Sequence, residues 1–268
     1  MPNQRFLDTA KRWMNKEAPA KRVQPATPIS QSSPLINNAS YSFLEGDFGR
    51  QVLEEYNQIA SKDYQGASAL NVLSFDDNVV KGSNPFAFVL LNKILTQQKM
   101  RIVTPADLER CLEKGELDLK GTYGDSGLVL RSENNPNEYL AKNLALQLSG
   151  RGYGVGDNPV MIQLAGLDLR YDSSSPHDLS FQLTGSSQFI YAPQLEHKNN
   201  QKKFNNADEN GLPVFDSGGN RTLYTRDGGL RRLYRSRDLD LDAWDDDLAD
   251  SDSYGRVVVC AEGTSRKK

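Results

Sequence analysis

The sequence contains few of the residues that build metal centres and disulfide frameworks. Only two cysteines, Cys111 and Cys260, and two histidines, His177 and His197, occur among its 268 residues. Two distant cysteines are too few for a disulfide framework, so we expect both to be reduced and structural. No set of histidines and cysteines has the spacing of a zinc site. The sequence therefore predicts no disulfide scaffold, no metal and no cofactor.

Long apolar runs and strong charge are also absent. No stretch approaches the roughly 18 apolar residues of a membrane span, and the first residues lack the apolar run of about 7–15 that marks a secretory signal. The formal net charge of −3 gives no field that would favour nucleic acid or acidic membranes. We therefore expect a monomer with no membrane span and no nucleic-acid partner, located in the cytoplasm or in a virus particle.

The C-terminal stretch 231–254, here called the variable segment, lacks particular residue types. It contains eight Asp and no Glu, four Arg and no Lys, and neither Gln nor Met. A solvated face selected only for polarity would mix Glu with Asp and Lys with Arg, because the charges are equivalent there. Changing the two adenines of an AAC codon reaches Asp, Arg, Tyr, Ser and Ala, but not Glu, Lys, Gln, Met or Trp. The bias therefore indicates diversification at AAC codons, with Trp244 as a fixed exception.

Apolar residues interrupt this polar segment and continue beyond it. We expect these framework residues to be buried: Leu230, Leu233, Leu239, Leu241, Leu248, Val257, Val258 and Val259. The polar residues between them should share one exposed surface. The plainer alternative is an acidic solvated face with no ligand.

The flanking residues carry a resemblance to a known family. They are Arg221-Thr222-Leu223-Tyr224-Thr225-Arg226, Gly229-Leu230, Leu248-Ala249, Ser251 and Gly255-Arg256-Val257-Val258-Val259. This pattern resembles the fixed residues around the C-terminal segment of archaeal and bacterial variable proteins of diversity-generating retroelements. In that family, adenine-directed mutagenic copying rewrites one segment displayed on a C-type lectin fold. The resemblance is sharp in the C-terminal part of the chain and diffuse upstream.

The resemblance implies an α+β, loop-rich C-type lectin fold of the formylglycine-generating-enzyme subtype, with two main helices and a mostly antiparallel sheet. The residues themselves place those helices over 85–98 and 105–114: Pro85 and Pro105 suit a first helical turn, and Thr104 with Asp107 forms a capping box. Periodicity predicts two more helices, over 45–63 and 137–149. Short strands are expected over 71–75, 101–103, 128–130, 160–164, 167–171, 179–183, 189–191, 223–224 and 257–260, with 193–220 as a loop.

Two regions divide the chain. Residues 1–40 are predicted to be a basic extension and linker, with six Lys or Arg and two acidic residues up to Pro25, a balance of +4. A short amphipathic helix there would dock on a partner or pack on its own domain. Residues 41–268 are predicted to form the C-type lectin-like ligand-binding domain.

The sequence contains only incomplete motifs for calcium binding and phosphate binding. Asp238, Asp240 and Asp242 match the opening of an EF-hand loop, but Ala243 and Ala249 occupy the positions of its Gly and bidentate Glu. The intervening Leu239 and Leu241 instead predict a strand, which would point all three carboxylates to one face. A calcium-dependent carbohydrate- or protein-binding lectin-like domain without diversification is the alternative function. The glycine-rich run 150–157 lacks the Lys-Ser/Thr of a phosphate-binding loop.

Catalysis is not predicted either. The copper chemistry of formylglycine-generating enzymes needs a cysteine pair, whereas the two cysteines here fall in a predicted helix and in a terminal strand. No Gly-x-Ser-x-Gly motif occurs, and a row of exposed aspartates lacks the burial that separates acid from base roles. We therefore assign no catalytic residue.

The predicted function is non-enzymatic binding of a protein or glycan, because Tyr, Ser, Arg, Asp and Trp on a rigid scaffold are typical of paratopes. The segment charge of four Arg minus eight Asp, −4, favours a basic or amine-bearing ligand. We expect Trp244 at the centre of the surface, ringed by Tyr234 and Tyr254. The predicted ligand-binding residues, here called display positions, are Arg231, Tyr234, Arg235, Ser236, Arg237, Asp238, Asp240, Asp242, Ala243, Trp244, Asp245, Asp246, Asp247, Asp250, Asp252, Ser253 and Tyr254.

Overall fold

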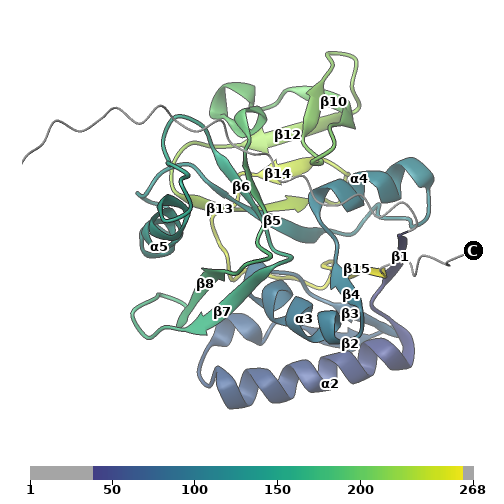
Figure 1. Cartoon of the computed structure of the whole chain (residues 1–268). Coiled ribbons are helices and arrows are strands. Elements are labelled where there is room, and N and C mark those ends of the chain that lie inside the picture. The colour runs from purple at the N-terminus through teal and green to yellow at the C-terminus, as the bar shows by residue number, and fades with distance from the viewer. Residues whose placement is uncertain (1–38, 262–268) are drawn as a thin grey trace, which may run out of the picture. The chain divides into compact units, whose positions relative to one another are not determined.

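The computed structural model describes residues 39–261 (Figure 1), in which every α-helix lies before residue 150 and the rest of the chain consists mainly of strands. The α-helices within these residues are α2 (Gly46–Asp63), α3 (Pro85–Gln97), α4 (Pro105–Lys114) and α5 (Glu138–Ser149). All four were expected from the sequence, and their bounds agree to within one residue. The predicted extension 1–40 lies outside the described residues apart from its last two.

Local capping explains where α3 and α4 begin. The Asn84 side chain accepts a hydrogen bond from the Ala87 backbone N–H at 2.8 Å, ahead of Pro85 in the first turn. Thr104 and Asp107 form the reciprocal capping box at the start of α4. Helix α3 is buried on nearly all sides and packs along α2 (Figure 1), so it lies at the centre of the main core.

A large curled sheet of eight strands forms the other half of the fold. Its strands, in spatial order, are β11 (Pro213–Phe215), β10 (Lys203–Ala207), β12 (Arg221–Thr225), β14 (Leu241–Ala243), β13 (Leu230–Arg235), β5 (Gly124–Leu130), β6 (Val160–Gln163) and β9 (Phe189–Tyr191). All neighbours are antiparallel except β12 and β14, which run parallel. The mostly antiparallel sheet predicted from the sequence is therefore present.

Smaller sheets complete the arrangement. Strand β15 (Val258–Ala261) pairs with both β1 (Ser40–Phe43) and β4 (Met100–Ile102), so the two ends of the described chain meet at the last valine strand. Two hairpins are formed by β2 (Ser74–Asp76) with β3 (Val79–Lys81) and by β7 (Leu167–Tyr171) with β8 (Leu179–Leu183). Short 3₁₀ helices occupy Ser68–Leu70, Pro193–Leu195 and His197–Asn199.

The loop predicted over 193–220 is wrong. This region contains β10, β11 and two of the 3₁₀ helices. Only Phe204 is fully buried in β10, and the register shifts between Phe204 and Asn206, so the alternation typical of a strand is too weak to detect. The strand expected over 128–130 also begins earlier, at Gly124. The prediction began too late because Gly124, Asp125 and Ser126 have the composition of a loop, although Asp125 and Ser126 are buried in the strand.

The framework residues divide between hydrophobic clusters. Leu230, Leu248, Val257 and Val259 join the main cluster around α3. A second cluster, under the other face of the sheet, contains Leu223, Leu233, Leu241 and Ala243. The third contains Val258 together with Cys111 and Cys260, which are both buried and form no disulfide within the described residues.

Leu239 is the exception among the framework residues. It is only half-buried and has a φ of 69° in a turn, so its predicted full burial is wrong.

Candidate functional site

Strand β13 carries the first part of the variable segment through the middle of the large sheet. It lies between β5 and β14, and cores cover both faces, so even its arginines are buried. The register against β5 shifts between Leu233 and Tyr234. Alternation along the strand directs Arg232 and Tyr234 to the same side.

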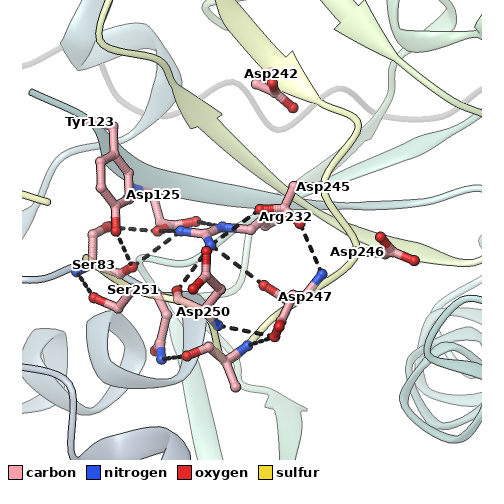
Figure 2. A network of polar contacts seen from close by, with 12 residues as sticks. Ser83, Tyr123, Asp125, Arg232, Asp242, Asp245, Asp246, Asp247, Asp250 and Ser251 are labelled. Carbon is pink, nitrogen blue, oxygen red and sulfur yellow. Dashed lines mark hydrogen bonds and ion pairs between the residues drawn. The ribbon is translucent and has the colours of Figure 1, made fainter. Parts of the chain in front are cut away.

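Arg232 is the centre of a buried polar network (Figure 2). Its Nε and Nη2 donate to the two carboxylate oxygens of Asp125 at 2.8 and 2.6 Å. The remaining N–H groups donate to Ser83 O at 3.1 Å and Asp250 O at 3.0 Å. Burial lowers the pKa of Arg232, but the Asp125 charge outweighs this and raises the pKa above its usual range. The guanidinium is therefore a permanent, neutralised cation that fixes the loop at residue 250.

Asp125 is itself held in place by the chain before α3. Ser83 Oγ donates to the Asp125 carboxylate at 2.6 Å, and the Asp125 N–H donates back to Ser83 Oγ at 2.9 Å. The Ser83 N–H donates to Ser251 Oγ at 2.9 Å, and the Asp252 N–H donates to Tyr123 OH at 2.8 Å. These contacts join β5, β13 and the entry to α3 to the end of the variable segment.

Most anchors of the loop 244–254 are made to its backbone. Asn137 Nδ2 donates to Asp246 O at 2.7 Å, and Asn84 Nδ2 donates to Ala249 O at 3.1 Å. Arg231 Nη1 donates to Trp244 O. Because a backbone carbonyl is present whatever the side chain, these anchors hold the loop path without fixing residue identity.

Glycine packing also explains two residues of the family-like pattern. A Cβ at Gly229, where φ is +57°, would stand 2.1 Å from Pro136 O, and a Cβ at Gly255 would stand 2.6 Å from the Gly82 carbonyl carbon. Both backbones approach a neighbour too closely for any side chain. They therefore set the two ends of the segment.

Several aspartates of the segment cap their own loop. The Asp242, Asp245, Asp247 and Asp252 side chains accept from backbone N–H groups two residues further on, at 2.7–3.0 Å. Asp reaches this position and the longer Glu does not, so Asx turns account for part of the Asp excess without any codon bias.

Other aspartates of the segment have no such role. Within the described residues, the side chains of Asp238, Asp246 and Asp250 accept no backbone hydrogen bond. At these positions the choice of Asp has no conformational explanation.

A hollow of about 310 Å³ opens beside Arg232. It is lined by Tyr123, Arg232, Tyr234, Ser236, Arg237, Asp238, Asp245, Asp250 and Asp252. The rings of Tyr123 and Tyr234 meet edge to face at 5.9 Å, and the Arg232 guanidinium lies 4.9 Å from the Tyr234 ring centre. Desolvation raises the pKa of Asp245 above its ordinary value. The hollow thus combines aromatic walls with four carboxylates, and its volume lies in the range of small-ligand pockets, about 300–1,000 Å³.

The display positions differ in exposure. Those that are exposed are Arg237, Asp238, Asp246, Asp247, Asp250, Asp252, Ser253 and Tyr254. Those that are half-buried are Tyr234, Ser236, Asp240, Asp242, Trp244 and Asp245. Those that are buried are Arg231, Arg235 and Ala243.

Because these three residues are buried, the prediction that every display position faces solvent is wrong. Arg235 Nη2 donates to Glu109 of α4 at 2.9 Å, and Arg221 binds the same carboxylate through two bonds of 2.6 and 2.8 Å. Ala243 packs in the second cluster. Arg231 is 5% exposed and donates to the backbone of Trp244 and Asp227. These residues stabilise the scaffold from within.

Trp244 does not line the hollow. Its ring packs against the Arg226 guanidinium at 3.7 Å, while Tyr254 packs against Arg237 at the same distance. The expected ring of Tyr234 and Tyr254 around Trp244 is therefore not formed through these contacts.

The strand expected to align Asp238, Asp240 and Asp242 on one face is also wrong. The Ser236 N–H donates to Asp240 O at 2.9 Å, which closes a turn between β13 and β14. The part of the chain that the structure describes contains no group of three or more His, Cys, Asp or Glu able to hold a metal ion.

Two residues that line the hollow, Tyr123 and Arg232, were not predicted from the sequence. Tyr123 precedes Gly124-Asp125-Ser126, which is typical of a loop, so nothing marked it. Arg232 was detectable, because Arg232, Tyr234 and Ser236 follow a period of two and all three line the hollow.

Comparison with models of known protein families, with curated proteins and with solved structures gives no match. Among residues 39–261, no helix is long and apolar enough to cross a membrane.

Proposed function

We propose that this chain is a non-enzymatic, receptor- or adhesin-like binding protein that displays a hypervariable surface on a C-type lectin fold and is diversified by a retroelement. One observation carries the proposal. Seven of the eight framework residues are buried, whereas eight polar residues of the variable segment line a hollow, and the loop 244–254 is held mainly through its backbone.

This arrangement separates stability from recognition. Substitutions at Asp238, Asp246 or Asp250 remove no backbone anchor, because their carbonyl groups remain. Substitutions at the framework leucines open cavities in a core. A surface with this division tolerates many sequences, which is the property that repeated rewriting requires.

The hollow defines the chemistry that this variant recognises. Four aspartates line it against two arginines, and Asp125 neutralises one of those, Arg232. The remaining excess is negative, and Tyr123 and Tyr234 supply rigid aromatic area. We propose a protein or glycan ligand that inserts an amine or another basic group here.

A binding screen tests the proposal. Glycan and protein arrays are probed with the wild-type chain and with a variant carrying Arg237→Ala, Asp238→Ala and Asp250→Ala, each with and without EDTA. A control variant, Lys62→Ala with Glu54→Ala and Asp63→Ala, removes the same charges from exposed positions of α2.

We expect ligands that the control variant retains, the hollow variant loses and EDTA leaves unchanged. Equal binding by all three proteins would contradict the assigned surface, and loss with EDTA would favour a calcium-dependent lectin. Sequencing the locus tests diversification separately: we expect a second copy of the segment that differs from it at adenines.

A further inference from the structure

A second hollow, of about 480 Å³, lies outside the display surface. It is lined by Arg131, Gly156, Asp157, Pro159, Glu196, His197, Lys198, Asp227 and Gly228. None of these residues lines the first hollow, and the glycine-rich run 150–157 contributes its end. The binding function proposed for the display positions does not involve this hollow.

Arg131 distinguishes this hollow from an ordinary surface depression. It is 7% exposed, and its Nη2 donates to the carbonyls of Leu195 and Ala243 at 3.1 and 3.3 Å and to Thr225 Oγ1. Its Nε and Nη1 have no hydrogen-bond partner among residues 39–261. No carboxylate pairs with it there, whereas the buried Arg232 and Arg235 each have one.

The unpaired guanidinium remains a cation. Burial and the neighbouring Arg231 lower the pKa of Arg131 to about 9, so it is still protonated at neutral pH. Arg231 adds a second positive charge, which the exposed Asp246 partly offsets through an ion pair at 3.7 Å, and the Arg231 Nε is also unpaired. A buried charge without a partner is costly, and the planar fork of an arginine matches a carboxylate.

The rim of the hollow selects among anions. Asp157 and Asp227 are exposed there and form no ion pair within the described chain, while Glu196 pairs with Lys198 at 2.6 Å. A phosphate dianion at Arg131 would be repelled by these carboxylates. A carboxylate monoanion that also carries a positive group would satisfy both Arg131 and the rim.

We propose that this hollow is a second binding site, which takes a small zwitterion with its carboxylate toward Arg131 and its ammonium toward Asp157 and Asp227. The site is independent of the display surface, so its occupancy does not depend on the sequence of the variable segment at exposed positions.

Isothermal titration and thermal unfolding of the full chain test the site. The probes are glycine, 4-aminobutyrate and 6-aminohexanoate, which vary the distance between the charges, with acetate and inorganic phosphate at matched ionic strength. We expect saturable binding and a raised Tm with at least one amino acid, weaker binding of acetate and none of phosphate.

Two variants assign the contacts. Arg131→Met should weaken amino-acid binding about tenfold or more. If that variant does not fold, the exposed Asp227→Asn should weaken amino-acid binding and strengthen acetate binding, because it removes a rim carboxylate that attracts the ammonium and repels the anion. Arg237→Ala, in the first hollow, is the matched control and should have no effect.

Three results would overturn the proposal. These are no saturable binding by any probe, phosphate binding as tightly as the amino acids, and equal binding by wild type and the folded variants.

Discussion

Replacing Arg232 with Met should destabilise the protein more than any change at an exposed display position. The Arg232 and Asp125 side chains are 2% and 0% exposed and are joined by two hydrogen bonds. Removing the guanidinium leaves the Asp125 carboxylate buried without a counter-charge and releases Ser83 O and Asp250 O. Breaking such a pair from one side costs about 3–5 kcal/mol.

Urea denaturation of a double-mutant cycle measures this interaction. We expect Arg232→Met to lower the free energy of unfolding by about 3–5 kcal/mol, and Asp125→Asn added to it to restore part of the loss, because the unpaired charge is gone. Arg237→Ala, an exposed arginine nearby, should change stability by less than about 0.5 kcal/mol. If Arg232→Met behaves like Arg237→Ala, or if the two changes simply add, the network does not hold the segment as we describe.

Three further predictions follow from particular contacts. Leu248→Ala should cost about 2–5 kcal/mol in urea denaturation, because Leu248 is fully buried in the main cluster, whereas Asp246→Ser should cost under about 0.5 kcal/mol; similar losses would refute the division. Desolvation raises the pKa of Glu109, but its partners Arg221 and Arg235 lower that pKa by more, so the folded-state pKa lies below the ordinary 4.5. The ionised Glu109 therefore stabilises the fold above pH 4.5, and this stabilisation is lost as the pH falls through the folded-state pKa. Glu109→Gln should make acid unfolding less steep, and an unchanged acid transition would contradict this. Trp244 lies outside the hollow, so Trp244→Ala should weaken binding of an array-identified ligand by well under about 2 kcal/mol in calorimetry, and a larger loss with little change in Tm would instead place Trp244 at the centre of the binding surface.

The helices could be predicted because their signals are local. The caps at Asn84 and Thr104 and the apolar periodicity of α2 and α5 depend on residues a few positions apart. Strands β10 and β11 could not, because one buried side chain per strand and a register shift leave no alternation to detect.

Burial of charge was the main failure at the site. Arg235 looks like any displayed arginine until α4 brings Glu109 to it, and the two residues are 126 positions apart in the chain. Asp125 likewise receives Arg232 from 107 positions away. Composition reports polarity, and only the tertiary fold supplies the partner that lets a polar group be buried.

The Asp excess illustrates a second limit. Four aspartates close Asx turns in a loop whose path was unknown from sequence, so a conformational preference resembled a codon signature. The codon interpretation therefore depends most on Asp238 and Asp250, where the structure offers no competing reason, because Asp246 forms an ion pair with Arg231 at 3.7 Å.

The tolerance of the segment tests the central claim most directly. Two libraries are compared on the full chain, each with NNC codons at five positions, and the protease-resistant fraction is counted by sequencing before and after digestion. One library varies the exposed Arg237, Asp238, Asp246, Asp250 and Ser253, and the other varies the buried Leu230, Leu233, Leu241, Leu248 and Val257. We expect most members of the first library to remain folded and almost none of the second. Equal depletion of both libraries would contradict a variable surface carried on an independent framework.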